Sequence, residues 1–295
     1  MWVIANPSAG SGRGLHHAGL VTRALTAAGI GCRLVVPDTS AATHRAAEDA
    51  GTSGASAILV AGGDGTVHDV LPALVDRSVP LGVIAGGSGD DIAAALGFPI
   101  DDPAQVATFM VEAISQGHRR SVDLGTATCA DGSEHHFVGV LSTGFDSAVN
   151  ERANRMTRLG GQRYNVAIVR ELASFRPVPY DVSIDGERIQ REGMLVAVGN
   201  GHRYGGGMLV CPSAEHDDGL LDLTWLGAVS RPRFLRALPS VYSGTHVDLP
   251  YVTTHRGRVL TIDAPGQVAY ADGERLGPLP ITVGIRPGAL QVLSG

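Results

Sequence analysis

Apolar and polar positions follow a repeated pattern along the first hundred residues: a short apolar run, a Gly-rich turn, and an Ala-rich stretch with helical spacing. Short apolar runs bounded by turns are typical of strands buried on both faces. The pattern predicts strands over 2–5, 32–36, 57–61 and 81–85, and helices over 15–28, 39–50, 67–75 and 92–96. Strands that alternate with helices favour a parallel sheet covered on both faces, whose ligand edge lies at the loops after the strands.

After about residue 120 the pattern changes to β-type runs separated by tight turn signals such as Asp131-Gly132, Asp185-Gly186 and Asp272-Gly273. The predicted strands cover residues 121–124, 137–141, 180–184, 194–198, 220–225, 258–262, 268–270, 281–285 and 290–293. Helices are predicted in an insertion at about 147–174 and over 231–242. We therefore expect an α/β domain over residues 1–121 and a mostly antiparallel β domain over residues 122–295.

Composition narrows the chemistry, because all 23 Lys+Arg positions are arginine. A phosphate loop ending in Gly-Lys-Ser/Thr, a Schiff-base enzyme and a Ser-x-x-Lys acyltransferase all need a lysine amine, so these classes are excluded. The net charge of -6 argues against a nucleic-acid partner, which favours a basic face. Arginines and backbone amides are therefore the expected phosphate ligands.

Cysteine spacing and hydropathy indicate a cytoplasmic protein. The three cysteines lie far apart and form no metal or disulfide pattern, and no apolar run reaches the roughly 20 residues that a membrane span needs. Six arginines and two acids between residues 151 and 176 give a local charge of +4. This segment is either a solvated helix face or a surface that docks peripherally on the inner face of an anionic membrane.

Three polar loops follow the predicted strands of the first half. Gly62-Gly63-Asp64-Gly65-Thr66 and Gly87-Ser88-Gly89-Asp90-Asp91 each lead into a helix, where backbone amides and the helix terminus favour a phosphate. The second loop lacks the Gly at position 90 that a serine-hydrolase G-x-S-x-G turn requires. The first loop, 6–14, offers Arg13 as a forked phosphate ligand.

These loops, in this order, resemble the diacylglycerol kinase catalytic family, which includes sphingosine and ceramide kinases and is similar in its nucleotide domain to NAD kinases. The opening motif of that family corresponds to Asn6-Pro7-Ser8-Ala9-Gly10. Further similar motifs follow over nearly the whole chain: Gly144-Phe145-Asp146, Gly199-Asn200-Gly201, Tyr204-Gly205-Gly206-Gly207-Met208, Pro212, Asp217-Asp218-Gly219-Leu220-Leu221-Asp222 and Asp272-Gly273-Glu274. NAD kinases share the Gly-Gly-Asp-Gly-Thr motif but not this later run, which favours a lipid kinase.

The resemblance implies a Rossmann-like α/β nucleotide domain followed by a β-sandwich domain of the NAD kinase and diacylglycerol kinase type. It implies Asp272 as the general base, with Glu274 and Asp64 at a catalytic Mg²⁺. On an extended segment Asp272 and Glu274 would point to the same side. Asp185-Gly186-Glu187 shows that the same triplet also serves as a plain hairpin turn.

The resemblance also implies the binding residues. A structural Mg²⁺ would be held by Asp218, the Leu220 carbonyl and Glu215, where the family usually has Asp. The nucleotide would be bound by Asn6, Pro7, Ser8, Gly10, Arg13, Gly62, Gly63, Asp64, Gly65, Thr66, Gly87, Ser88, Gly89 and Asp91. Asp90 stands where the family usually has Asn, which leaves nucleotide preference open.

Together these observations predict an ATP- and Mg²⁺-dependent lipid kinase that acts on diacylglycerol or a similar lipid. Two alternatives stay open: a kinase of a soluble substrate such as NAD or a metabolite, and a non-catalytic regulator that binds nucleotide or lipid. The sequence does not decide the acceptor lipid, and it leaves a homodimer open.

Overall fold

The computed structural model describes residues 1–156 and 163–295, which form two compact units. Unit 1 comprises residues 1–124, 216–218 and 286–295, and unit 2 comprises residues 125–215 and 219–285. The chain therefore returns to unit 1 twice after the end of its first half. Arg158, from the basic segment, lies outside the described residues.

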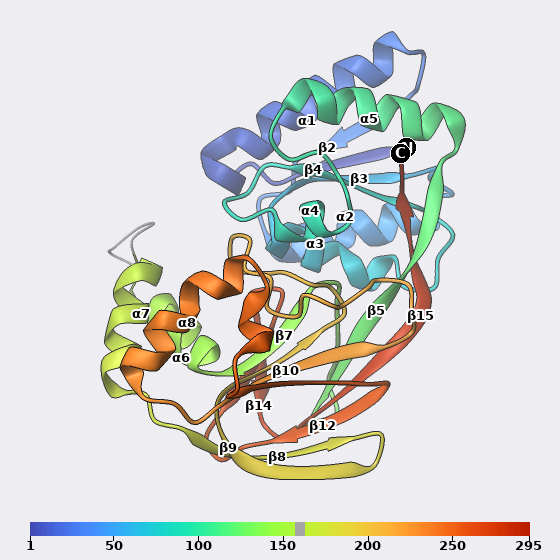
Figure 1. The fold of residues 1–295 in the computed structure, drawn as a ribbon. Coiled ribbons are helices and arrows are strands. Elements are labelled where there is room, and N and C mark those ends of the chain that lie inside the picture. Colours follow the sequence, from blue (N-terminus) through green and yellow to red (C-terminus); the bar gives the residue numbers. More distant parts are fainter. Residues whose placement is uncertain (157–162) are drawn as a thin grey trace. The chain divides into compact units, whose positions relative to one another are not determined.

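Unit 1 is a parallel sheet with helices on both faces (Figure 1). Its strands are β1 (Trp2–Ala5), β2 (Arg33–Val35), β3 (Ile58–Gly62) and β4 (Leu81–Ala85), with contributions from β5 (Arg119–Cys129) and β15 (Ile281–Leu293). The order is β2-β1-β3-β4-β15, and these neighbours pair in parallel. Its helices are η1 (Ala9–Gly12), α1 (Arg13–Ala27), α2 (Ser40–Thr52), α3 (Asp64–Val70), η2 (Leu71–Ala73), α4 (Asp91–Ala95) and α5 (Pro103–Gln116).

The helices of unit 1 form where their sequences supply a cap and a buried stripe. Thr39 accepts a hydrogen bond from the Ala42 amide at the start of α2, and Asp102 accepts one from the Ala104 amide at the start of α5. In α1, Ala18, Val21 and Leu25 are fully buried, at the spacing of one helix face. The four predicted strands and four predicted helices of this half are confirmed, while α5 was not predicted.

Unit 2 is built mainly from antiparallel strands. These are β6 (Glu134–Phe137), β7 (Val140–Gly144), β8 (Val178–Ile184), β9 (Glu187–Gly199), β10 (Leu221–Gly227), β11 (Val252–Gly257), β12 (Val259–Asp263), β13 (Val268–Ala271) and β14 (Glu274–Pro278), with the remaining parts of β5 and β15. Strand β9 pairs with β7, β8 and β10, so it is central. A large apolar core that includes Phe137, Tyr180 and Trp225 lies between the strands.

Three helices in unit 2 pack on one another over a smaller apolar core (Figure 1). They are α6 (Phe145–Asn154), α7 (Arg163–Ser174) and α8 (Arg231–Tyr242), and η4 (Thr245–Asp248) follows α8. Phe145 stacks edge-on against Phe175 and Phe234, which joins the three helices. None of the helices in the described ranges is both long and apolar enough to cross a bilayer.

Several predicted strands of the second half were wrong in extent: the one predicted over 194–198 begins at Glu187 as β9, and β11 and β14 were not predicted. Residues 137–141 form the end of β6 and the start of β7. The strand is interrupted at Val138 and Gly139, because their amides donate to the Asp272 carboxylate. Residues 281–285 and 290–293 belong to one strand, β15, which runs through the polar stretch between them. The predicted α/β and antiparallel β architectures are confirmed.

Candidate functional site

Three loops of unit 1 meet at the carboxyl ends of β1, β3 and β4. Because the strands are parallel, their following loops lie at one edge of the sheet. Asn6 Nδ2 donates to Thr66 Oγ1 at 3.1 Å, and the Gly86 amide donates to the Gly62 carbonyl at 3.1 Å. The guanidinium of Arg13 donates through Nη2 to the Gly87 carbonyl. The structure therefore brings together the three loops that the sequence singled out.

Glycine is required where these loops approach most closely. A Cβ atom on Gly87 would overlap the Cα of Gly63, and one on Gly10 would overlap the carbonyl oxygen of Gly86. Gly10 also has a φ of 53°, in the left-handed region. Glycine at these positions allows the loops to pack against one another.

The acidic residues of these loops hold backbone amides. Asp64 accepts from the amides of Asp91, at 3.3 Å, and Ile92, at 3.0 Å, at the start of α4. Asp90, with a φ of 54°, accepts from the amides of Gly87, at 2.8 Å, and Gly86, at 3.3 Å. An asparagine oxygen could accept the same bonds, which explains how Asp fits where the family usually has Asn. Asp91 is buried, whereas Ser88 is exposed at the loop tip.

Asp272 lies in the tight turn between β13 and β14 in unit 2. Its φ is 50° and that of Gly273 is 85°, as in a two-residue hairpin turn. Its carboxylate accepts from three consecutive amides: Val138 at 2.8 Å, Gly139 at 2.9 Å and Val140 at 3.2 Å. The side chain is thus buried and fixed in orientation.

Asn200 supports the segment that binds Asp272. It is fully buried, and its Nδ2 donates to the Val138 carbonyl at 2.8 Å. The amides of Asn200 and Gly201 both donate to the Gly139 carbonyl, at 3.0 and 2.9 Å. The Gly199-Asn200-Gly201 motif therefore positions the amides that hold Asp272.

A tight turn separates Glu274 from Asp272. Asp272 is 8% exposed, while Glu274 is exposed at the start of β14, because the turn reverses the chain between them. The segment is therefore a turn rather than extended, and the placement of both carboxylates on one side stays a prediction. The Asp185-Gly186 turn has the same geometry, with a φ of 48° at Asp185, and the Asp185 carboxylate likewise accepts from the amides of Arg258 and Val259.

The predicted metal ligands come from both units, Asp64 and Asp218 from unit 1 and Glu215, Leu220 and Glu274 from unit 2. Within the described ranges, no three Asp, Glu, His or Cys side chains are grouped so as to hold a metal ion. Glu215 is exposed, and the Asp218 segment belongs to unit 1, where the amide of Asp123 donates to the His216 carbonyl at 2.6 Å. Both metal sites stay predictions.

A polar cluster around Asp146 was not predicted as a site. Ser142 Oγ donates to Asp146 Oδ2 at 2.6 Å, and the Tyr204 hydroxyl bonds to the same carboxyl. Burial raises the pKa of Asp146, and burial followed by the charge of Asp146 raises the pKa of Tyr204. Asp146 and Tyr204 belong to the motifs 144–146 and 204–208, whose resemblance to the family is the sequence feature that could have indicated this cluster. The cluster fastens the Gly-rich segment 204–208 to the end of β7.

Comparison with known proteins gives two family matches. Residues 1–127 match the diacylglycerol kinase catalytic domain, and residues 139–294 match the YegS C-terminal NAD kinase beta sandwich-like domain. A diacylglycerol kinase of Mycobacterium tuberculosis is 39% identical over 293 residues, covering 98% of this chain and 93% of that protein. A diacylglycerol kinase of Bacillus subtilis is 29% identical, covering 81% and 77%. A crystal structure of a diacylglycerol kinase from Bacillus anthracis matches with a TM-score of 0.74 at 20% identity, covering 100% and 96%.

Proposed function

Because the chain belongs to the diacylglycerol kinase family, we propose that it transfers the γ-phosphate of ATP to the hydroxyl of diacylglycerol, giving phosphatidic acid. The observation that carries this proposal is the family match of both halves, with 39% identity to a diacylglycerol kinase over 98% of the chain. In this reaction the hydroxyl oxygen bonds to the γ-phosphorus, the bond to the bridging oxygen breaks, and ADP leaves.

The loops of unit 1 are suited to the nucleotide. Their Gly-rich turns precede helices, and the contacts among Asn6, Thr66, Arg13 and Gly87 keep the three loops together. Mg²⁺ would neutralise phosphate charge during transfer. In this proposal it enters as the Mg–ATP substrate, with Asp64 and Glu274 as its predicted protein ligands.

Asp272 is the proposed base for the acceptor hydroxyl. Its carboxylate is held in one orientation by three amides, as a group that must meet a substrate hydroxyl at hydrogen-bond distance requires. Asp185 is the internal comparison, because it has the same turn and similar amide bonds on another hairpin.

The test is transfer of γ-labelled phosphate from ATP to a total lipid extract, with identification of the labelled product. Asp272→Asn should lower turnover by about 100-fold or more while ATP affinity stays within about two-fold, since general base catalysis contributes at least that much. Asp185→Asn should keep turnover. Full turnover by Asp272→Asn would remove Asp272 from the mechanism, and labelling of only a soluble alcohol by the wild-type protein would refute a lipid acceptor.

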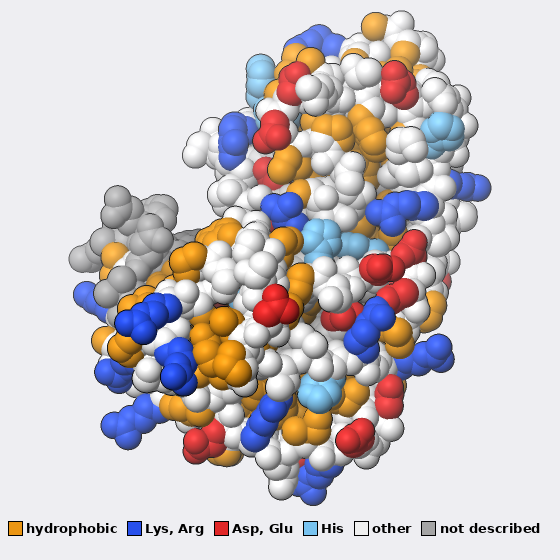
Figure 2. All heavy atoms as spheres, in the orientation of Figure 1, with side chains coloured by type: hydrophobic (Ala, Val, Ile, Leu, Met, Phe, Trp, Pro, Cys, Tyr) orange, Lys and Arg blue, Asp and Glu red, His pale blue; other side chains and the backbone are white. Residues whose placement is uncertain are grey.

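A lipid acceptor requires contact with a bilayer, and α8 has the surface that we propose for it. The helix carries Arg231, Arg233 and Arg236 and no acidic residue, and Leu235 and Tyr242 are 49% and 57% exposed. In Figure 2 arginine and hydrophobic side chains gather together over α8. By contrast, Arg152 and Arg155 of the basic segment around α6 are in ion pairs with glutamates.

A further inference from the structure

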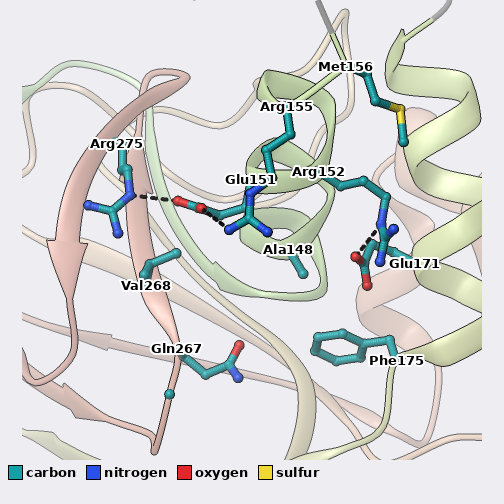
Figure 3. A pocket seen from close by; sticks show the side chains of 11 residues that line it. Ala148, Glu151, Arg152, Arg155, Met156, Glu171, Phe175, Gln267, Val268 and Arg275 are labelled. Carbon is teal, nitrogen blue, oxygen red and sulfur yellow. Dashed lines mark hydrogen bonds and ion pairs between the residues drawn. The ribbon is translucent and has the colours of Figure 1, made fainter.

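A pocket in unit 2 is lined by neither Asp272 nor any residue of the three loops of unit 1. Its volume is about 510 Å³, and it opens between α6, the end of α7 and the chain before and after β13 (Figure 3). Met156, Phe175 and Val268 give it an apolar wall. Its charged residues are three arginines and two glutamates: Arg152, Arg155, Arg275, Glu151 and Glu171.

The charges of this pocket do not balance. Arg275 Nε donates to Glu151 Oε1 at 2.6 Å, Arg152 Nε donates to Glu171 Oε1 at 2.6 Å, and Arg155 Nη2 donates to Glu151 Oε2 at 3.4 Å. Arg275 therefore shares its carboxylate partner with Arg155. With three cations against two anions, the lining has a net charge of +1.

The guanidinium groups retain donors for a ligand. Among the described residues, Arg152 and Arg275 donate only through Nε, so their forked Nη edges are not engaged there. Figure 3 shows the Nη groups of Arg275 directed away from Glu151. Arg155 is 81% exposed and has the longest of the three ion pairs, so it can turn toward a ligand at the least cost.

From this arrangement, we propose that the pocket is a second anion site, which binds a phosphate monoester through Arg155, Arg152 and Arg275. Forked guanidinium groups match the terminal oxygens of a phosphate. The apolar wall accommodates the remainder of a larger ligand. The phosphate could belong to free phosphate or to the head group of phosphatidic acid, and the site does not depend on the proposed kinase activity.

The test is isothermal titration calorimetry on the full chain, with a non-hydrolysable ATP analogue present to occupy the nucleotide loops. The two titrants are inorganic phosphate and water-soluble dioctanoyl phosphatidic acid. At least one should bind, and Arg155→Gln should weaken that binding about ten-fold or more, because a charge-assisted hydrogen bond is lost. Arg155→Lys should recover only part of the affinity, since its ammonium has no fork.

Arg188→Gln is the matched control. Arg188 is 64% exposed and pairs with Asp181 on the β8–β9 hairpin, so the variant makes the same charge change on another surface. Binding of phosphate alone, or of the lipid alone, supports the site and identifies the source. Equal affinities of the wild-type and Arg155→Gln proteins, or equal losses in Arg155→Gln and Arg188→Gln, would overturn it. Because binding is read directly, absence of kinase turnover leaves this result interpretable.

Discussion

At the scale of single residues, Asn200 acts on the proposed base through the backbone. Its Nδ2 bond to the Val138 carbonyl orders the segment whose amides hold Asp272. Asn200→Ala should lower kcat at least ten-fold with little change in the KM for ATP, since the loops proposed to bind nucleotide, 6–14, 62–66 and 87–91, lie in unit 1. It should also cost about 1–3 kcal/mol of unfolding free energy, because a buried carbonyl loses its donor.

The measurements for Asn200 are steady-state kinetics and urea unfolding of the same preparations. Asn150→Ala is the control, because Asn150 is also a buried asparagine of unit 2 but bonds to Asp146, at 3.4 Å. If both variants lose stability equally and neither changes kcat beyond its unfolded fraction, Asn200 is structural only.

Arg13 joins two loops rather than only presenting a charge. Its guanidinium donates to the Gly87 carbonyl and, at 3.4 Å from Nε, to the Gly10 carbonyl. A lysine ammonium has no fork that reproduces this pair. Arg13→Lys should raise the KM for ATP about five-fold or more, whereas Arg23→Lys, at an exposed site on the same helix, should not. Unchanged nucleotide affinity in Arg13→Lys would show that the loops are held without it.

The sequence was most informative where chemistry depends on local turns. Asp272-Gly273 was predicted as a turn because Asp and Gly adopt positive φ readily, and the structure confirms it. The amides that donate to the Asp272 carboxylate lie more than 130 residues earlier in the chain. No local sequence pattern specifies that contact. For the same reason the hydrogen bonds from the amides at the start of α4 to the Asp64 carboxylate were not predicted.

At the scale of elements, α6 is linked to the β13–β14 hairpin through Glu151. This carboxylate accepts from Arg275 Nε at 2.6 Å and from the Tyr270 hydroxyl at 3.1 Å. The hydrogen bond from Arg275 is the main cause that lowers the pKa of Glu151. A carboxyl whose pKa is lowered in the native state stabilises the fold at pH values above its ordinary pKa, near 4.3. This stabilisation is lost as the pH falls through the lower pKa of the native state.

Glu151→Gln should therefore lower the unfolding free energy at pH 7 by about 1 kcal/mol and reduce its slope with pH below about 4.3. Urea denaturation at pH 7, 5, 4 and 3 measures both quantities. Glu192→Gln, which changes an exposed glutamate on β9, should match the wild-type slope. Identical slopes for wild type and Glu151→Gln would show that the ion pair does not couple to folding.

Element prediction succeeded where the period of apolar residues was uninterrupted. The four predicted strands of the α/β half and the helix at 231–242 are confirmed. The break between β6 and β7 was not predicted, because the apolar run 137–141 continues through it. The strand is interrupted because the amides of Val138 and Gly139 donate to the Asp272 carboxylate. This tertiary contact overrides the local pattern.

At the scale of the whole molecule, the chain crosses between its units through two long strands. β5 and β15 each begin in one unit and end in the other, which is why the last ten residues return to the parallel sheet. The change of pattern near residue 121 indicated two architectures. The return of residues 286–295 was not predictable from that change, because an apolar strand does not specify its partner.

Membrane docking through α8 is the prediction that belongs to the whole molecule. Each basic residue near an anionic surface contributes on the order of 1 kcal/mol, so replacing Arg231, Arg233 and Arg236 by Gln should weaken vesicle binding roughly 100-fold. Sedimentation with vesicles that contain phosphatidylserine measures this. Wild-type binding should also fall as salt is raised from 0.05 to roughly 0.5 M, because screening shortens the reach of the charges.

A control variant that loses the same three charges outside α8 distinguishes docking through α8 from an effect of net charge. Arg23, Arg45 and Arg258 are exposed outside α8, and their triple replacement by Gln makes an equal change in net charge. If α8 is the contact surface, this control retains most of its vesicle binding while the α8 variant loses it. Leu235→Gln tests the apolar part of the contact, since it removes an exposed hydrophobic side chain without changing charge. Equal losses in the two triple variants, with none in Leu235→Gln, would mean that vesicle binding follows net charge alone and that α8 is not the docking surface.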